Sequence, residues 1–416
     1  NSGIVHYQAP LNAENAAPTG LTMDEFAGGI LNRTQLLDKL AQLGYPMTID
    51  PKHGSIPSSI SAVDPDFKMP QEWKTSLAFD YSVPVSFPLS VSVEGIFRKT
   101  VNAASIRDWS MKNVGGFARF NGVDNRPIYP TDFRQGTKAF ILENTSDGYG
   151  WSASATINAR PTDWLSLMAA YTHTVSKEVT SLPGSAAESA FTYVPTVQGP
   201  NNIAIHNALN TTPDRFVASI TAHDKGNNHY SLIYETWRGG YNYSYMTTND
   251  MNGDGYNYDA IYIPTDAQVE KGEFRFVSED DKTRFMDYVH NNSYLKNHQG
   301  EYAEGYSVYS PWVHRIDLSY KHDFNFNVGS TKHTLQVGFD VKNLLNFFNS
   351  SWGVSKYLNP AIGSDARILK YEGVDAEGYA TFSTPASINK NTETFVLNHA
   401  IGQCWYASIG VKYIFN

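Results

Sequence analysis

The sequence predicts an all-β protein, an antiparallel transmembrane β-barrel whose strands are joined by long loops on one side. The first observation is composition, since 26 Tyr, 22 Phe and 8 Trp among 416 residues, together with 31 Gly, favour β-structure. The second is an alternation of apolar and polar residues with period two along most of the chain. The third is a regular alternation of short and long connections, which is typical of outer-membrane barrels.

The first region, residues 1–70, is interpreted as an extracellular loop region with a short helix. Thr22 caps a first helical turn, and helical spacing continues to Leu43, where Gly44 ends it. Beyond this region the period changes to two, which predicts strands. We therefore assign 71–416 to the barrel.

The clearest predicted strand is 148–160. Its apolar face carries Tyr149, Trp151, Ala153, Ala155, Ile157 and Ala159, and its polar face carries Ser152, Ser154, Thr156, Asn158 and Arg160. The same alternation predicts further strands at about 71–81, 89–101, 163–177, 213–224, 229–238, 312–322, 334–342 and 403–415. Strands of about ten residues suit a tilted membrane crossing.

Every second connection between these strands is long. Short connections are predicted at 82–88, 160–163, 224–228 and 323–332, and long extracellular loops at about 102–147, 178–212, 239–311 and 346–402. Compact domains seldom contain such loops, whereas outer-membrane barrels pair short periplasmic turns with long extracellular loops. Counting strands backward from a periplasmic C-terminus places the first region outside and keeps the apolar segment 137–142 within a loop.

Charge and cysteine content exclude several classes of protein. A net charge of −9 without a block of Lys or Arg argues against a nucleic-acid partner. The single cysteine, Cys404, permits neither an internal disulfide nor a thiolate metal cluster. No apolar run approaches the roughly 18 residues that a membrane helix needs.

Several strand residues indicate what each face of the sheet contacts. Aromatic residues near strand ends fit the two girdles at membrane interfaces, although rings also favour strands in general; examples are Trp73, Tyr81, Tyr149, Trp151, Tyr320, Trp405 and Tyr413. Charged residues on the polar faces predict a polar lumen, and these are Glu94, Arg98, Arg315, Asp317, Asp340 and Lys342.

Six short motifs occur in a characteristic order along residues 137–416. They are Glu143–Gly150, Gly199–Asn202, Asp250–Gly255, Ile261–Pro264, Ser310–Asp317 and Val341–Asn346. As a set they resemble the C-terminal barrel portion of TonB-dependent outer-membrane transporters of the Bacteroidetes type. The resemblance is strongest to Oar-like, SusC-related receptors with a carboxypeptidase-regulatory-like domain.

This resemblance implies a large barrel of about 22 strands around an N-terminal plug, which TonB contacts. The chain shows neither the plug nor the early strands, so we expect the same precursor or a second chain to supply them. The implied function is binding of a nutrient outside and import into the periplasm, with outer-membrane lipids as surroundings and a surface lipoprotein as a further candidate partner. The aromatic terminal strand resembles the signal that the barrel-assembly machinery reads, although the final residue is Asn416.

The segment that begins at Asp250 matches the first half of a calcium-binding loop. Carboxylate and amide oxygens alternate there, and a glycine permits the sharp turn; the candidate ligands are Asp250, Asn252, Asp254, the backbone carbonyl of Tyr256, and Asp259. The position of the usual bidentate glutamate is Ile261. Asn-Gly and Asp-Gly pairs also form ordinary turns, so a polar loop tip without a metal is the alternative.

Aromatic residues in the loops are candidates for contact with cargo. Their rings could stack on sugars or peptides, and the set consists of Trp237, Tyr241, Tyr243, Tyr245, Trp312 and Trp352. Packing of the loops against one another is the alternative role. The aromatic and nearly neutral loops favour an oligopeptide or a glycan.

Motifs of catalysis are absent from the sequence, so we expect no enzyme and assign no catalytic residue. H-E-x-x-H, G-x-S-x-G and phosphate-binding glycine loops do not occur. Ser293 and Lys296 match S-x-x-K without the companion motifs. The alternative function is a secreted, calcium-bound β-sandwich that binds carbohydrate, which predicts solubility without detergent.

Overall fold

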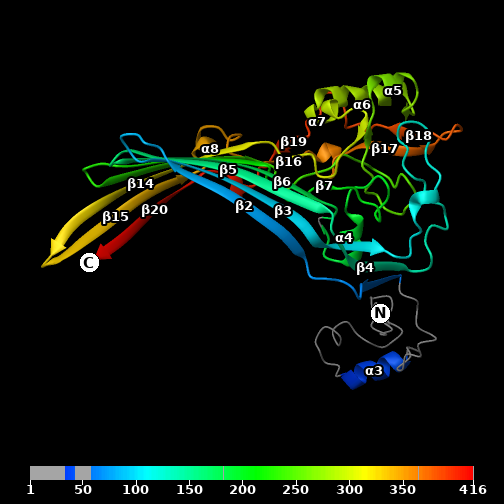
Figure 1. Cartoon of the computed structure of the whole chain (residues 1–416), viewed down its shortest axis with the longest axis horizontal. Coiled ribbons are helices and arrows are strands. Elements are labelled where there is room, and N and C mark those ends of the chain that lie inside the picture. Colours follow the sequence, from blue (N-terminus) through cyan, green and yellow to red (C-terminus); the bar gives the residue numbers. More distant parts are fainter. Residues whose placement is uncertain (1–32, 43–57, 181, 364, 416) are drawn as a thin grey trace.

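A computed structural model describes residues 33–42, 58–180, 182–363 and 365–415. Within these residues, nine long strands form one continuous antiparallel sheet (Figure 1). In sheet order they are β2 (Gln71–Ser82), β3 (Leu89–Asp108), β5 (Gly148–Thr162), β6 (Leu165–Glu178), β8 (Asp214–His223), β9 (Asn228–Arg238), β14 (Val313–Val328), β15 (Thr331–Lys342) and β20 (Tyr406–Phe415). The all-β antiparallel prediction is confirmed, and each of these strands overlaps a predicted one.

The strand register places apolar side chains on the same face throughout the sheet. One row crosses six strands from β6 to β20 and consists of Leu167, Ile220, Leu232, Leu318, Val341 and Ala407. A second row crosses the other three pairings, from β2 to β6, as Phe79, Val93, Ala155 and Tyr171. Because the side-chain period of a strand is two, this register keeps the whole apolar set on one side.

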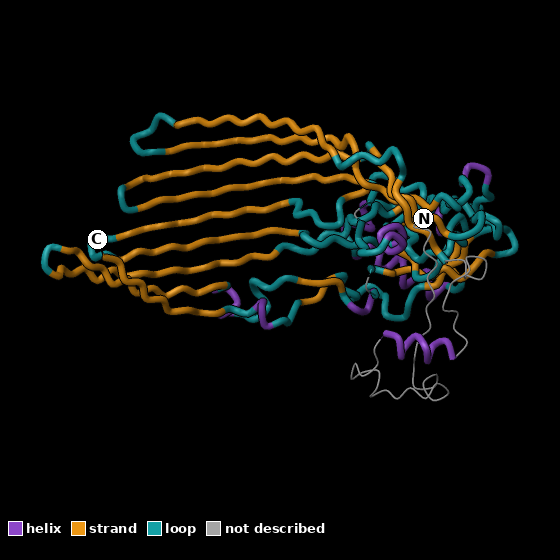
Figure 2. The backbone as a smooth tube through the Cα atoms, turned by 90° about the horizontal axis from the view of Figure 1, so that it is seen from below, coloured by secondary structure: helices purple, strands orange, loops and turns teal. Residues whose placement is uncertain are grey.

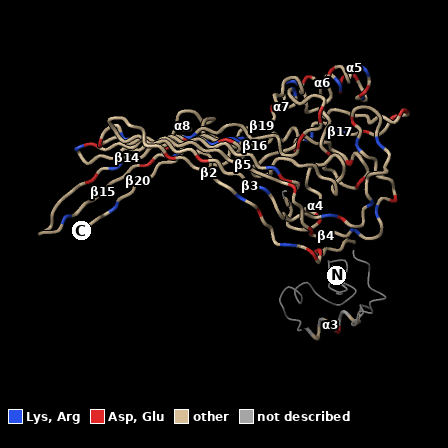
Figure 3. Tube along the Cα trace, in the orientation of Figure 1, with Lys and Arg blue, Asp and Glu red and all other residues tan. Residues whose placement is uncertain are grey.

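Much of this apolar face is exposed, whereas Val341 is buried and Leu167, Leu232 and Leu318 are partly covered. Leu77 on β2 is 81% exposed and Ile409 on β20 is 76% exposed. On β5, Trp151 and Ala155 are exposed while Ser152 and Thr156 on the opposite face are partly covered. The pattern is the reverse of a water-soluble sheet, in which the apolar face packs on the core. Most residues of the strands carry no charge, as Figure 3 shows.

Four short connections join the strands at one end of the sheet, where Figure 2 shows the hairpins. They comprise residues 83–88, 163–164, 224–227 and 329–330. The connection 329–330 replaces the predicted connection 323–332, and that prediction was wrong. Phe324, Phe326 and Val328 continue the exposed apolar row of β14, so the strand extends to a two-residue turn in which Gly329 adopts φ +63°.

The long connections gather at the other end and form what we call the head, residues 109–147, 179–213, 239–312 and 343–405 (Figure 1). The helices of the head are η2 (Val114–Gly116), α4 (Ala187–Thr192), α5 (Asp266–Glu270), α6 (Glu279–Asn291), α7 (Ser293–Asn297), α8 (Leu344–Phe348), η3 (Pro360–Ile362) and η4 (Ile401–Gln403). Its strands are β4 (Lys138–Thr145), β7 (His206–Asn207), β10 (Met246–Thr247), β11 (Tyr262–Ile263), β12 (Arg275–Phe276), β13 (Glu301–Tyr302), β16 (Lys356–Leu358), β17 (Arg367–Val374), β18 (Ala380–Ser383) and β19 (Phe395–Leu397).

The buried apolar core lies in the head. Helix α6 illustrates why it forms: the Ser278 hydroxyl accepts a hydrogen bond from the Asp281 N–H (3.1 Å), and three acidic residues occupy the first turn. Phe285 and Val289, one turn apart, are fully buried. Phe274 and Phe382 stack beside them at 4.6 Å between ring centroids. The long loops therefore fold as a packed unit.

The N-terminal region contributes α3 (Arg33–Gln42) and β1 (Ser59–Val63). The predicted helix is present over α3, while its Thr22 cap lies outside the described residues. The periodicity does not predict β1, a five-residue strand that pairs in parallel with β4. Strand β4 pairs with the end of β3 that lies beyond the residues paired with β2 and β5, so segment 137–142 extends the sheet into the head. In the described segments, no helix has the length and apolar character of a membrane span.

Candidate functional site

A ladder of charges and one indole ring follows the polar face of the sheet near the head. Arg215 on β8 pairs with Glu235 on β9 (2.6 Å), and Lys342 on β15 pairs with Asp317 on β14 (2.8 Å). The Arg315 guanidinium lies over the Trp237 ring at 5.4 Å. These side chains share a face because Arg215 and Trp237 are register partners, as are Arg315 and Glu235. The ladder gives this face a mixed, polar character.

The remaining predicted charges of the lumen belong to the same face. Glu94 lies opposite Ser154, and Asp340 lies opposite Ser319 and Ser408. Arg98 donates a hydrogen bond to the Ser176 hydroxyl (2.7 Å). All of these positions alternate with the apolar set, as the sequence predicts.

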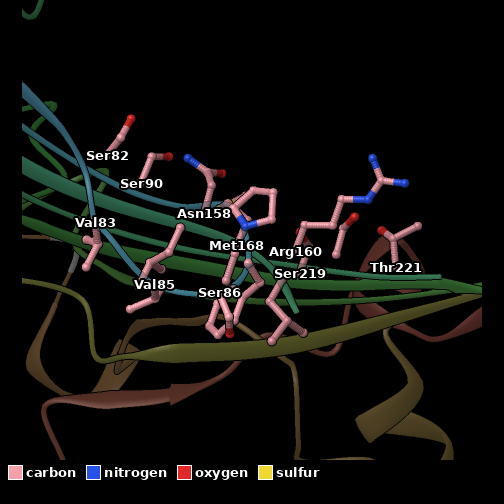
Figure 4. Close-up of a pocket in the computed structure, with 16 residues that line it drawn as sticks. Ser82, Val83, Val85, Ser86, Ser90, Asn158, Arg160, Met168, Ser219 and Thr221 are labelled. Atoms are coloured by element: carbon pink, nitrogen blue, oxygen red, sulfur yellow. The ribbon is translucent and has the colours of Figure 1, made fainter. Parts of the chain in front are cut away.

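A cavity of about 670 Å³ lies on the polar face at the hairpin end (Figure 4). The connection 83–88 forms one wall. Polar-face residues of four strands form much of the rest, and they are Ser90, Asn158, Arg160, Met168, Ser219 and Thr221. Ser82, Leu89, Ala159, Ser166 and Leu167 complete the lining. The polar face is therefore hollowed at the end opposite the head.

The predicted aromatic residues do not form one site. Tyr245 is buried in the core of the head, where its hydroxyl accepts a hydrogen bond from Asn292 (2.7 Å). Trp312 is exposed beside Arg238, whose guanidinium lies 5.9 Å from its ring, and Trp352 is exposed in another loop. Only Tyr241 and Tyr243 come together, with ring centroids 5.2 Å apart.

Tyr241 and Tyr243 line a cavity of about 100 Å³ with three tyrosines that the sequence analysis missed. We call the five rings the tyrosine cage; they are Tyr193, Tyr241, Tyr243, Tyr258 and Tyr306, and Asp365 lines the same cavity. The cage draws on four separate loop segments, so no local spacing in the sequence could have indicated it. The high tyrosine content was the only available signal.

The predicted calcium loop is a set of turns in which side-chain oxygens of three candidate ligands already accept hydrogen bonds from backbone N–H groups. The Asp250 carboxylate accepts hydrogen bonds from the N–H groups of Gly253 and Gly255 (both 2.8 Å). The Asn252 side-chain oxygen accepts one from the Asp254 N–H (3.0 Å), and Asp254 accepts one from the Tyr256 N–H (2.8 Å). Among the described residues, no three His, Cys, Asp or Glu side chains converge as a metal site would require.

Asp259, the last predicted ligand, belongs to a buried ion network. The Arg126 guanidinium is fully buried, binds both carboxylate oxygens of Asp124 (2.9 and 3.0 Å) and binds Asp259 (3.1 Å). It also donates to the Ala260 carbonyl oxygen (2.7 Å), and Tyr302 donates to Asp124 (3.1 Å). The network ties the segment around residue 125 to the 250–260 loop.

Negative charge accumulates beside this network. Burial, followed by the charges of Asp259 and Asp250, raises the pKa of Asp254 to about 8. Burial likewise raises the pKa of Asp259 to about 6, against the opposing effect of Arg126. A cation here would relieve the repulsion, so the charge of the loop fits calcium, while the Arg126 pair already uses Asp259. Calcium binding stays a prediction.

Comparison with known proteins adds one structural likeness. No family model and no curated protein match the chain. Among solved structures, the chain is similar to the outer membrane transporter YddB from Escherichia coli, with a TM-score of 0.36 and 11% identity. The similarity covers 83% of this chain and 33% of that transporter, so the chain spans about a third of its length.

Proposed function

We propose that this chain is the barrel part of an outer-membrane transporter that binds a nutrient outside the cell and imports it into the periplasm. The observation that carries the proposal is an apolar face that follows the register of the nine strands and is exposed on inner strands at Ile157, Ile220 and Phe339, opposite a polar and charged face. In water such a face would drive aggregation, whereas in a bilayer it contacts lipid tails while the polar face lines a lumen.

The distribution of the connections supports an orientation. In outer-membrane barrels the short turns face the periplasm and the long loops face outward. By this rule the head is extracellular, and the hairpins and the C-terminus are periplasmic.

Both edges of the sheet favour pairing with further strands. In the described chain, β2 pairs with β3 alone and β20 with β15 alone, and nearly all residues of both edge strands are exposed. Unpaired edges do not occur in a bilayer, because their N–H and C=O groups would lack partners. We propose that strands of the same precursor or of a second chain close a large barrel of about 22 strands around a plug. TonB would act through that plug.

The transport mechanism we propose is selective binding without covalent chemistry. The extracellular head would contact the cargo through its aromatic rings. Trp237 and the charged pairs of the polar face would contact it further along the lumen. An oligopeptide or a glycan suits this combination of rings and paired charges. A calcium ion in the Asp250 loop would have a structural role, and a surface lipoprotein would act as a lid partner.

The secreted β-sandwich is the alternative, and one observation weighs against it. A sandwich buries the apolar face of each sheet against a second sheet. Over the described residues, no second sheet covers the apolar face of the nine strands.

The test is membrane retention followed by uptake. We expect the protein to remain in outer membranes after washing with carbonate and urea, and to require detergent for extraction. Cells that express it with its partner chain should take up labelled oligopeptide or oligosaccharide, and an uncoupler should stop uptake. Release by the wash would refute membrane insertion, and uptake that survives the uncoupler would refute TonB coupling.

A further inference from the structure

The tyrosine cage is a small cavity with a buried floor and an open rim. Tyr306 is 6% exposed at the floor, while Tyr193 and Tyr241 are 46% and 54% exposed at the rim. The Tyr306 hydroxyl donates a hydrogen bond to the Tyr193 carbonyl oxygen (3.0 Å), which ties floor to rim. Tyr193 and Tyr258 lie 5.1 Å apart between ring centroids. A volume of about 100 Å³ admits one small chemical group.

The backbone around the cage is held in a conformation that side chains rarely adopt. Leu182, Tyr306 and Ala366 have φ of +42°, +54° and +51°, and each lines the cavity or adjoins a residue that does. Each such residue is strained, and the surrounding structure must offset that strain. Strain of this kind concentrates at ligand sites, and here it orients the floor ring and the segment of Asp365.

The cage combines aromatic rings with a carboxylate. Five tyrosine rings, whose faces carry the negative side of the aromatic quadrupole, line the cavity together with Asp365. Burial first, and then the charge of Asp365, raises the pKa of Tyr241 and raises that of Tyr258 to about 12. Arg367 pairs with Asp365 at 3.5 Å, and its guanidinium lies 5.3 Å from the centroid of the Tyr258 ring, so it offsets part of the negative charge on that side of the cage. One of its N–H groups donates a hydrogen bond to the Thr247 carbonyl oxygen, and the other cage rings have no such cation over them among the described contacts.

We propose that the tyrosine cage binds an ammonium group of a peptide, either its N-terminus or a lysine side chain. Aromatic rings that converge around a cation attract it through their π faces, and a nearby carboxylate completes the charge. A neutral sugar would stack on the rings but would gain no charge attraction to the π faces or to the carboxylate. The proposal deepens the proposed function and rests on it for the identity of the cargo, since it selects oligopeptide over glycan.

Calorimetric titration of the chain, purified in detergent with any polypeptide that accompanies it, tests the cage. The probes are choline and its neutral isostere 3,3-dimethylbutan-1-ol. We expect choline to bind roughly tenfold more tightly or better, because only the cation gains the π and carboxylate attraction. Equal affinities, or no binding of choline, would overturn the proposal.

Variants at the exposed rim separate binding from folding. Tyr193→Leu and Tyr241→Leu remove a ring face while keeping an apolar side chain, and each should weaken choline binding roughly two- to tenfold. Tyr357→Leu, an exposed tyrosine of the head outside the cage, is the matched control and should bind choline as the native chain does. A control that weakens binding as much as the rim variants would contradict a specific cage.

Peptide probes distinguish the two sources of the ammonium group. A tripeptide amide with a free N-terminus is compared with its N-acetyl form, and an N-acetyl lysine peptide with its norleucine counterpart. Preference within the first pair assigns the N-terminus, and within the second pair the lysine side chain. Preference in neither pair overturns the peptide assignment. Because the titration needs no membrane, loss of ammonium binding in a membrane-inserted protein would reject the cage alone, and choline binding by a protein that fails to insert would reject the proposed function alone.

Discussion

Apolar side chains are buried in the head but exposed on one face of the sheet. In the head, Phe285 and Val289 are fully buried in a contiguous apolar core. In the sheet, Leu77 and Ile409 are among the most exposed residues, while Ser152, Ser154 and Thr156 on the polar face of β5 are partly covered. This contrast is the one expected if, as proposed, the head folds in water and the apolar face of the sheet contacts lipid.

The largest expected effect comes from breaking the buried network of the head. Arg126→Ala leaves Asp124 and Asp259 buried without their cation, and we expect a loss of about 3–5 kcal/mol in the stability of the head. Hydrogen exchange should show faster exchange in β11 with unchanged protection in β5. Arg275→Ala, which breaks more exposed pairs with Asp375 and Glu377, is the control and should cost much less. Equal effects of the two variants would contradict a head held by buried charge.

The next effect concerns the apolar face of the sheet. Ile220→Arg places a charge between Leu167 and Leu232, and it should cost about 2–4 kcal/mol in phospholipid vesicles if it lies near the bilayer midplane. Urea titration in vesicles measures it. Thr221→Arg, on the polar face one residue away, should have little effect. A larger loss of stability for Thr221→Arg than for Ile220→Arg would contradict the proposal that the apolar face contacts lipid.

A smaller effect is expected from calcium in the Asp250 loop. If the ion binds the folded head and not the unfolded chain, a calcium concentration 100 times the dissociation constant adds about 2.7 kcal/mol to the free energy of unfolding. Thermal unfolding with calcium and with chelator measures the gain, and Asp250→Asn should diminish it. An unchanged melting temperature in the native protein would leave the loop as a polar turn.

The smallest predicted effect is a pH dependence of the head. Burial raises the pKa of Asp254 in the folded state to about 8, well above the ordinary value of an aspartate, so the folded state holds the proton more tightly than the unfolded one. The stability gained is fully present at low pH and is lost as pH rises from about 4 to 8. Asp254→Asn should flatten this dependence by at least about 1.4 kcal/mol, the equivalent of one pKa unit. A native head whose unfolding free energy is constant over this range, measured in chelator, would disprove the assignment.

Sequence reasoning located the long strands because their two faces contact different surroundings. That difference imposes a strict period of two, which is visible in residues 148–160 without any structure. The wrong connection at 323–332 has the same origin. Asn325 and Asn327 alternate with Phe324 and Phe326 along β14, and they resemble turn residues although they belong to the polar face of the strand. Strand β1 is too short for its period to be distinguished from chance.

The candidate sites were harder to predict because they depend on contacts between distant segments. Asp259 belongs to a local calcium pattern, yet its ion-pair partner Arg126 lies 133 residues away in sequence. The tyrosine cage joins Tyr193 of the connection 179–213 to Tyr258 and Tyr306, which lie 48 residues apart in the connection 239–312. Only packing of the head brings such residues together, and the alternation of residues in the strands contains no information about that packing.

The lipid exposure of β5 is the most direct test of the comparison between sheet and head. Spin labels are attached to single cysteines at residues 151–157, in a background with Cys404→Ser, and the protein is reconstituted in vesicles with its partner chain. We predict that labels at Trp151, Ala153, Ala155 and Ile157 are accessible to oxygen dissolved in lipid, and that labels at the intervening residues are accessible to a water-soluble nickel reagent. Uniform accessibility to the nickel reagent along the strand would contradict a sheet that faces lipid.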